Sequence, residues 1–283
     1  MRYFAIALVL AVGCSPAPPR RPDPPRDLDA TVTLRRNIVP VSPLLRDPER
    51  RYPHGPGALC SWDRDRYLHF FSETAEFCDV VFLDSSARVI EIQQLAGMSE
   101  TGLTSESEVR HALFLSAGAV KKDGLQVGDK VAFSATIADA KPAPMPVIKV
   151  GGHEIHVEIS NTIAQRMRGL MHRPRLSRDD GMLFCYPAED ERGYWMKNTL
   201  IALDIAYFAE DGRLINVARM KPHADPSQGG ELKAPSAGPA RFVLEVNYGW
   251  FDARKLIDAD GRPNQPVKLE IPDSVRKLAD SAE

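Results

Sequence analysis

Short apolar segments separated by Gly and Pro turns are the pattern that most restricts how residues 147–247 can fold. Segments 147–150 and 153–159 flank the turn Gly151-Gly152, which predicts a β-hairpin. A second tight-turn signal lies at Asp211-Gly212. Further strands are expected at 182–185, 194–197, 203–208, 213–220 and 241–247. Short strands between such turns predict a mainly β fold of the β-sandwich or jelly-roll-like barrel type.

Two local patterns refine this prediction. In the second strand of the hairpin, Ile155, Val157 and Ile159 alternate with His156 and Glu158, so we expect one buried and one solvated face. One helix should follow, because Thr162 and Gln165 fit a capping box and Gly169 suits a helix end. Its buried stripe would consist of Ile163, Met167 and Leu170.

Residues 57–131 resemble a degenerate copy of the second half of the chain, which predicts two β domains in tandem. Class-matched segments include 57–60 over 181–184, 70–74 over 195–199, 79–82 over 204–207, 88–90 over 213–215 and 110–118 over 241–249. A Pro-rich linker separates the copies. The expected divisions are a first domain at 30–138, the linker at 139–146, a second domain at 147–269 and a C-terminal tail at 270–283.

The second copy also carries a spaced set of uncommon motifs. They are Arg166-x-Arg168-Gly169-Leu170-Met171, Gly181-Met182-Leu183-Phe184, Tyr194-Trp195-Met196-Lys197-Asn198-Thr199 with Asp204, and Phe242-Val243-Leu244-Glu245 ahead of Gly249. Their order resembles the domain-of-unknown-function family 192 over about residues 147–269. The resemblance implies a compact, mainly β fold and supplies no established chemistry.

The N-terminus resembles a bacterial lipoprotein signal. Arg2, an apolar run at 3–12 and small residues before Cys14 are typical of a secretory signal at 1–13. The run is too short to span a hydrocarbon layer of ~30 Å. Residues 14–29 form a Pro-rich tether that cannot fold. We expect lipid attachment at Cys14 and a periplasm-facing location in the cell envelope, with Ser15 favouring the outer membrane; the alternative is an ordinary signal peptide.

Composition excludes several classes of function. With 36 basic and 38 acidic residues and no basic stripe, nucleic acid is not an expected partner. The scattered His156, His172 and His223 and the absence of CxxC spacing predict no metal, and no motif predicts a cofactor. Export would permit a Cys60–Cys78 disulfide, but buried thiols are equally compatible with these apolar surroundings.

Comparison of the two copies divides the polar residues into two groups. Thr199 and Asp204 recur as Thr74 and Asp79, so we expect them to stabilise the fold. We expect a structural role for Gly169 and Gly181 as well. Three others do not recur, and these are candidates for ligand binding. Lys197 aligns with Ser72, Asn198 with Glu73 and Glu245 with Phe114.

Strand alternation places Glu245 on the same face as Val243. If that face is buried, the carboxylate needs a cation, and Lys197 or Arg166 could supply it; otherwise Glu245 faces solvent on an edge strand. Trp195 is a further ligand-binding candidate or, with Met196, part of the core. The basic residues around the helix end would bind an anion or interact with the helix dipole. They are Arg166, Arg168, His172 and Arg173.

Three functions are compatible with these features. The first is a non-catalytic envelope protein whose second domain binds a polar ligand, such as a glycan or an envelope fragment. The second is a structural scaffold of an envelope assembly, with a protein partner. The third is a hydrolase or lyase in which Glu245 or Asp204 acts as a base and Lys197 with Asn198 stabilises negative charge. We favour a function other than catalysis, because neither fold nor family supplies a reaction.

Overall fold

The computed structural model describes residues 30–44, 57–71, 77–99, 101–139, 142, 144–228, 230 and 234–282. The predicted signal peptide, Cys14 and the predicted tether lie outside these residues, as do Ser72, Glu73 and Thr74. No helix in the described part of the chain has the length and hydrophobicity needed to cross a membrane.

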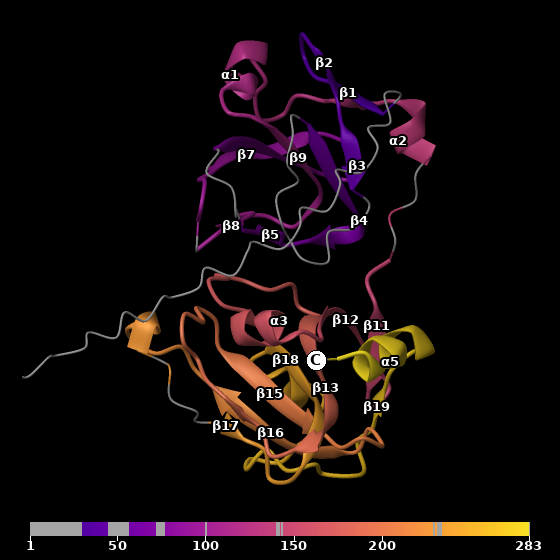
Figure 1. Ribbon diagram of the computed structural model, residues 1–283, viewed down its shortest axis with the longest axis vertical. Helices are drawn as coiled ribbons and strands as arrows, with labels where there is room; N and C mark the ends of the chain where they lie inside the picture. Colours follow the sequence, from indigo (N-terminus) through magenta and orange to yellow (C-terminus); the bar gives the residue numbers. More distant parts are fainter. Residues whose placement is uncertain are drawn as a thin grey trace, which may run out of the picture.

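The chain is mainly β and folds into two domains in tandem, as the sequence predicts (Figure 1). The first domain has a five-stranded sheet of order β3-β4-β9-β6-β7 and two smaller sheets. Its elements are β1 (Thr31–Thr33), β2 (Ile38–Pro40), β3 (Ser42–Leu44), β4 (Ala58–Arg66), β5 (His69–Phe70), β6 (Cys78–Leu83), β7 (Val89–Leu95), β8 (Leu103–Thr104), β9 (Val109–Ser116), α1 (Ala119–Asp123), β10 (Ala132–Phe133) and α2 (Ala135–Asp139).

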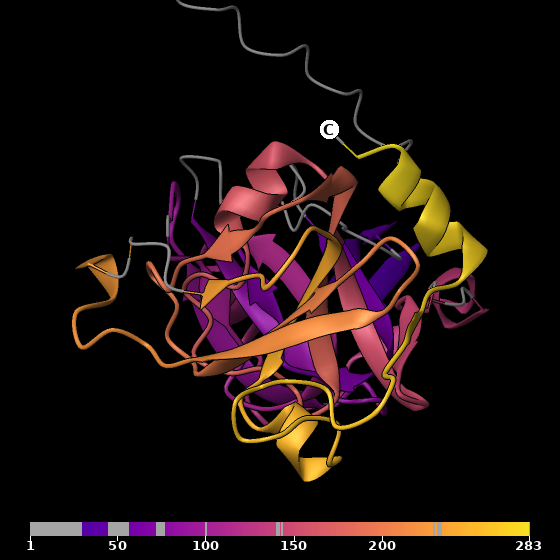
Figure 2. The same cartoon turned by 90° about the horizontal axis from the view of Figure 1, so that it is seen from below.

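The second domain has one curled seven-stranded sheet of order β16-β15-β18-β13-β12-β11-β19 and a small pair, β14-β17. Its elements are β11 (Val147–Val150), β12 (His153–Ser160), α3 (Ile163–Arg168), β13 (Asp180–Asp190), β14 (Gly193–Tyr194), β15 (Leu203–Phe208), β16 (Leu214–Met220), the 3-10 helix η1 (Pro226–Gln228), β17 (Ala234–Pro235), β18 (Ala240–Asn247), α4 (Trp250–Ala253), β19 (Leu269–Glu270) and α5 (Asp273–Asp280). Figure 2 shows α3 and α5 at the periphery of this domain.

Five strands of the main sheet have the same order and the same pairing in the two domains. The order β3-β4-β9-β6-β7 repeats as β12-β13-β18-β15-β16, and in each copy the first pair is parallel and the others antiparallel. The long strand bulges at matching places, between Ser61 and Arg66 in β4 and between Cys185 and Asp190 in β13. The alignment inferred from the sequence is therefore correct for the strands of the main sheet.

The alignment was wrong by one residue at the small sheet. Phe70 pairs with Leu103 in the first domain, and Tyr194 pairs with Ala234 in the second. Phe70 therefore corresponds to Tyr194, not to Trp195. The registers of the small sheets are fixed by pairing with distant strands, which a gapless comparison of two sequences cannot detect.

One buried aspartate in each domain fixes the start of a short helix. Asp204 accepts hydrogen bonds from the backbone N–H groups of Gly249 and Phe251, at 3.1 and 3.2 Å, where α4 begins. Asp79 accepts one from Val120 at 3.0 Å, where α1 begins. A carboxylate satisfies the unpaired N–H groups of a helix N-terminus. Asp204 thus has a structural position at the start of α4.

The sheet of the second domain has a core on each face. Along β18, Phe242, Leu244 and Val246 belong to one core, whereas Val243 packs in the other. The predicted C-terminal tail packs on the second domain, because α5 contributes Val275 and Ala279 to the first of these cores. The second core lies on the face that includes Glu245.

Two predicted surfaces differ from the structure. The capping box of Thr162 and Gln165 forms as predicted, but Ile163 and Met167 are 61% and 52% exposed, so the expected buried stripe was wrong. The helix spans only six residues, and Leu170 enters the core from the loop that follows it. Glu158 is not solvated either, because the first domain covers it.

The cysteines of the described residues are buried thiols. Cys60, Cys78 and Cys185 form no disulfide. Burial raises the pKa of Cys185 to about 12, which keeps its sulfur protonated and unreactive at neutral pH. Cys60 and Cys78 are therefore thiols in the structure and not the disulfide that export would permit.

Candidate functional site

Glu245 lies at the centre of the second domain. On β18 it pairs with Met182 of β13 and Ile205 of β15, and its side chain enters the core on that face of the sheet. The residue is only 5% exposed. Among the described residues no hydrogen bond reaches its carboxyl group. The prediction that Glu245 is buried is confirmed over the alternative of an exposed edge strand.

Three tyrosines surround this carboxyl group. Tyr186 and Tyr194 share a hydrogen bond between their hydroxyl oxygens at 2.9 Å, and the hydroxyl of Tyr207 donates to the carbonyl of Ala234. The rings of Tyr194 and Tyr207 meet edge to face, with centroids 6.0 Å apart. Glu245 acts electrostatically on all three phenols and raises their pKa values together with burial.

Burial raises the pKa of Glu245 to about 8, because the core solvates a carboxylate poorly. The guanidinium of Arg173 opposes this shift but does not cancel it. Glu245 is therefore mainly a neutral carboxylic acid at pH 7. A protonated carboxyl group has an O–H that can donate a hydrogen bond.

The cation beside Glu245 is Arg173, not Lys197 or Arg166 as predicted. Arg173 is 3% exposed and donates two hydrogen bonds to Glu158, at 3.1 and 2.8 Å. Arg66 of the first domain donates to the same carboxylate at 2.8 Å. The basic residues at the helix end are thus not one cluster: Arg173 turns inward and joins the interface between the domains.

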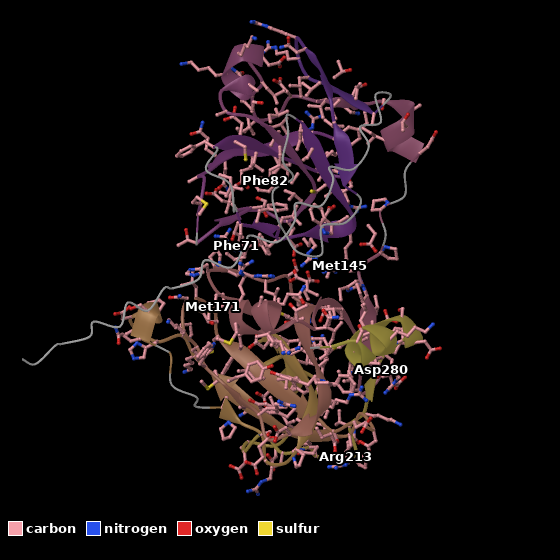
Figure 3. The ribbon with its side chains drawn as sticks, in the orientation of Figure 1. Phe71, Phe82, Met145, Met171, Arg213 and Asp280 are labelled. Carbon is pink, nitrogen blue, oxygen red and sulfur yellow. The ribbon has the colours of Figure 1, made fainter. Side chains whose placement is uncertain are left out.

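This interface links the end of β4 and β5 to the loop after α3. Tyr67 N–H donates to Ser177 Oγ at 3.2 Å. The guanidinium of Arg168 lies 4.7 Å from the centre of the Phe71 ring. Figure 3 shows the labelled Phe71, Met145 and Met171 between the two domains. The loop that holds Arg173 is therefore fixed from both sides.

None of the other predicted ligand-binding residues shares a hydrogen bond or ion pair with Glu245 in the described part of the chain. Lys197 is exposed, and its Cδ lies near Gly230 rather than in the core. Asn198 has a φ of 54°, and its backbone bonds to Pro226 and His172, so it forms a turn. Trp195 is half-buried. Arg166 donates to the carbonyl of Cys185 at 2.9 Å and lies over the Tyr186 ring, which ties α3 to β13.

The residues predicted to be structural have structural positions. Thr199 is buried and closes the turn through its N–H to Met196. Gly169 ends α3 with a φ of 49°, and a Cβ there would lie 3.8 Å from Oε2 of Glu245. A Cβ on Gly181 would lie 2.7 Å from the carbonyl oxygen of Glu245, so β13 can approach β18 only with glycine here.

The first domain has an apolar version of the same interior. Strand register places Phe114 where Glu245 lies, since Phe114 pairs with Ala58 and Val80 as Glu245 pairs with Met182 and Ile205. The same register places aromatic residues without hydroxyl groups at the tyrosine positions. They are Trp62 for Tyr186, Phe70 for Tyr194 and Phe82 for Tyr207.

The place of the three tyrosines in the core and the position of Arg173 beside Glu245 were not predicted from the sequence. The duplication could have predicted two of the tyrosines. In the alignment that places Phe114 opposite Glu245, Phe82 and Trp62 stand opposite Tyr207 and Tyr186 and lack their hydroxyl groups. The position of Arg173 could not be predicted in this way, because the similarity between the two copies begins at residues 57 and 181, after Arg173 in the second copy.

Glu245→Gln should remove one component of the pH dependence of stability. Because the folded-state pKa of about 8 exceeds the ordinary value of 4.5, the folded protein binds this proton more tightly than the unfolded chain. The contribution to the free energy of unfolding is therefore complete below pH 4.5 and is lost as the pH rises through 8. The wild-type value should fall relative to the variant by on the order of a few kcal/mol.

Urea unfolding of both proteins across this range measures the difference. Burial lowers the pKa of the buried His69 and of the partly buried His111, but their contributions are the same in the two proteins and cancel. The exposed Glu191→Gln serves as the control for the substitution itself. A difference in the free energy of unfolding between wild type and Glu245→Gln that stays constant with pH would show that folding does not raise the pKa of Glu245.

The comparisons with known proteins agree with the internal duplication. Residues 49–133 and 146–261 match the DUF192 family, which is described as an uncharacterized ACR. No curated protein is significantly similar to the chain.

Solved structures include similar proteins. A protein of unknown function from Novosphingobium aromaticivorans is 32% identical over 44% of this chain and 83% of its own, with a TM-score of 0.36. A putative transcription regulator from Sinorhizobium meliloti is 29% identical over 44% of this chain and 92% of its own, also with a TM-score of 0.36. The two matched family regions together span more than half of the sequence, and the chain therefore belongs to the DUF192 family, with one intact and one degenerate copy of its domain.

Proposed function

We propose that the second domain binds a small polar ligand at the Glu245 interior, in a non-catalytic protein of the bacterial envelope. The first domain is then a structural module that holds the binding domain. A glycan or another envelope fragment is the class of ligand that the inferred location favours. The protein would be attached to the membrane by lipid on Cys14 and face the periplasm, with outer-membrane sorting favoured by Ser15.

The observation that carries this proposal is the contrast between the two interiors. Four positions that carry a carboxyl or hydroxyl group in the second domain carry Phe or Trp in the first. Because both domains have the same strand order and register, the fold does not require those polar groups. Their presence in one copy needs another explanation, and ligand recognition is the simplest.

Energetics support this interpretation. A buried polar group without a hydrogen bond costs about 1–3 kcal/mol, and Glu245 receives none from the described residues. An apolar side chain of similar size avoids that penalty, as Phe114 does in the first domain. Binding sites commonly contain groups that are unfavourable for stability, because a ligand completes their interactions.

The contacts at the interface support a structural role for the first domain. Arg66 is 4% exposed and pairs with Glu158 and Asp180 of the second domain, at 2.8 and 3.2 Å. Removing one partner of a buried ion pair typically costs about 3–5 kcal/mol. Glu158 also holds Arg173, so the first domain fixes a residue beside the proposed site.

Neither alternative function gains a specific observation. A hydrolase or lyase would use Glu245 or Asp204 as a base. Both oxygens of Asp204 accept backbone N–H groups and the residue is fully buried. Lys197 is exposed, while Glu245 lies within the core. A pure scaffold would leave the polar interior of the second domain unexplained.

A ligand screen tests the binding function. The full mature chain is heated with members of a broad metabolite set and with envelope extracts, in parallel with Glu245→Met. A ligand at 100 times its Kd should stabilise the wild type by about 2.7 kcal/mol and leave the variant unchanged. If no compound or extract shifts the wild-type melting temperature, or if every shift persists in Glu245→Met, the proposed site is excluded.

Cellular fractionation tests the location. Wild type should sediment with membranes, and Cys14→Ser should prevent lipid attachment and shift the protein out of the membrane fraction. Ser15→Ala retains the cysteine and is the control for substitution at this site. A wild-type protein in the soluble fraction, cleaved without lipid, would instead support the ordinary signal peptide.

A further inference from the structure

We infer that the ligand carries a carboxylate or a similar oxyanion, which binds between the guanidinium of Arg173 and the carboxyl group of Glu245. This inference rests on the proposed function, since it names the chemical class of the ligand at the same site. It is carried by the buried, unpaired donor of Arg173 and by the carboxyl and hydroxyl groups of the same core.

Arg173 has an unused hydrogen-bond donor. Its two terminal nitrogens both donate to Glu158, at 3.1 and 2.8 Å. Its Nε is buried and has no hydrogen-bond partner. The side chain is 3% exposed, so water cannot replace the missing acceptor freely. A buried N–H without an acceptor is costly, and a ligand oxygen would remove that cost.

The charged side chains around Arg173 form one ion-pair cluster. Among the described residues, the ion-pair cluster consists of three arginines and two carboxylates. The arginines are Arg64, Arg66 and Arg173, and the carboxylates are Glu158 and Asp180. Burial lowers the pKa of Arg66 and Arg173 to about 9, so both remain charged at neutral pH. Asp63 also acts electrostatically on Arg66, so the acidic side chains balance the three arginines. The unpaired Nε–H of Arg173 is what favours a ligand with an acceptor oxygen at this position.

Glu245 does not supply that balancing charge at neutral pH, because it is then a neutral acid. In this form it offers an O–H donor in the same region as Arg173. Since one hydroxyl of the Tyr186–Tyr194 pair accepts the bond from the other, its own proton is a further available donor. Buried donors that lack an acceptor are suited to an oxyanion.

The pH dependence of binding follows from the groups that face Glu245. They are the guanidinium of Arg173 and the phenols of Tyr186, Tyr194 and Tyr207. The phenols stay neutral, because burial raises their pKa values. When Glu245 ionises, it loses its O–H donor and its charge repels an anion. Affinity should therefore fall as Glu245 loses its proton.

Calorimetric titration of the full mature chain tests the inference. The probes are acetate, succinate and inorganic phosphate, compared with glucose and tetramethylammonium, each measured against equal ionic strength of sodium chloride. An anionic probe should bind wild type at pH 6 and lose about tenfold more affinity by pH 9 than it loses with Glu245→Gln. Glu245 raises the pKa of Arg173, so the Glu245→Gln protein should lose the charge of Arg173 at a lower pH than the wild type. An excess loss of affinity in the wild type therefore comes from Glu245 and not from Arg173.

Each outcome decides between the two proposals. Anion binding that disappears in Glu245→Met supports both. Anion binding that persists in Glu245→Met occurs elsewhere and overturns the inference. If glucose or tetramethylammonium binds in a Glu245-dependent way and anions do not, the site is real but the ligand class is wrong. If neither these probes nor the broad screen give a Glu245-dependent ligand, both proposals fail.

Discussion

The pairing of one central strand with its two neighbours determines what each domain can place in its interior. In the second domain β18 lies between β13 and β15, and in the first β9 lies between β4 and β6. Side chains alternate across a strand, so a slip of one residue would exchange the two faces. The buried aspartates Asp204 and Asp79 hold the helix that follows the central strand in each copy. This shared frame makes the substitution of Phe114 for Glu245 a controlled comparison within one molecule.

The comparison also shows how each interior is filled. Phe114 lies beside the small Ala58 and Val80, whereas Glu245 lies beside the larger Met182 and Ile205. Neighbouring side chains thus compensate for the volume at the central position, as close packing requires. The second domain retains a polar centre inside a core that could be apolar. The first domain, which lacks that centre, fixes Glu158 and through it Arg173 beside the site.

Much of the fold could be predicted from the sequence, because strand alternation, turns and capping are local. The hairpin at 147–159, the capping box at Thr162 and the inward direction of Glu245 follow from such patterns. Contacts between distant segments could not be read in this way. Alternation alone made Glu158 appear solvated, but Arg66 of the other domain covers it. Likewise, the proximity of Lys197 in the motif did not make it the partner of Glu245, since Arg173 reaches that site from a loop.

The central claim is that the fold tolerates Glu245 rather than depending on it. The most direct test is the free energy of unfolding, from urea titration at neutral pH, of the reciprocal variants Glu245→Met and Phe114→Glu. We predict that Glu245→Met is at least as stable as wild type, because Met fills the site without a polar group to desolvate. Phe114→Glu should lose about 3 kcal/mol or more, since it combines a cavity with a buried polar group. A Glu245→Met variant less stable than wild type by about 2 kcal/mol or more would show that the carboxyl group stabilises the domain, which would contradict the account.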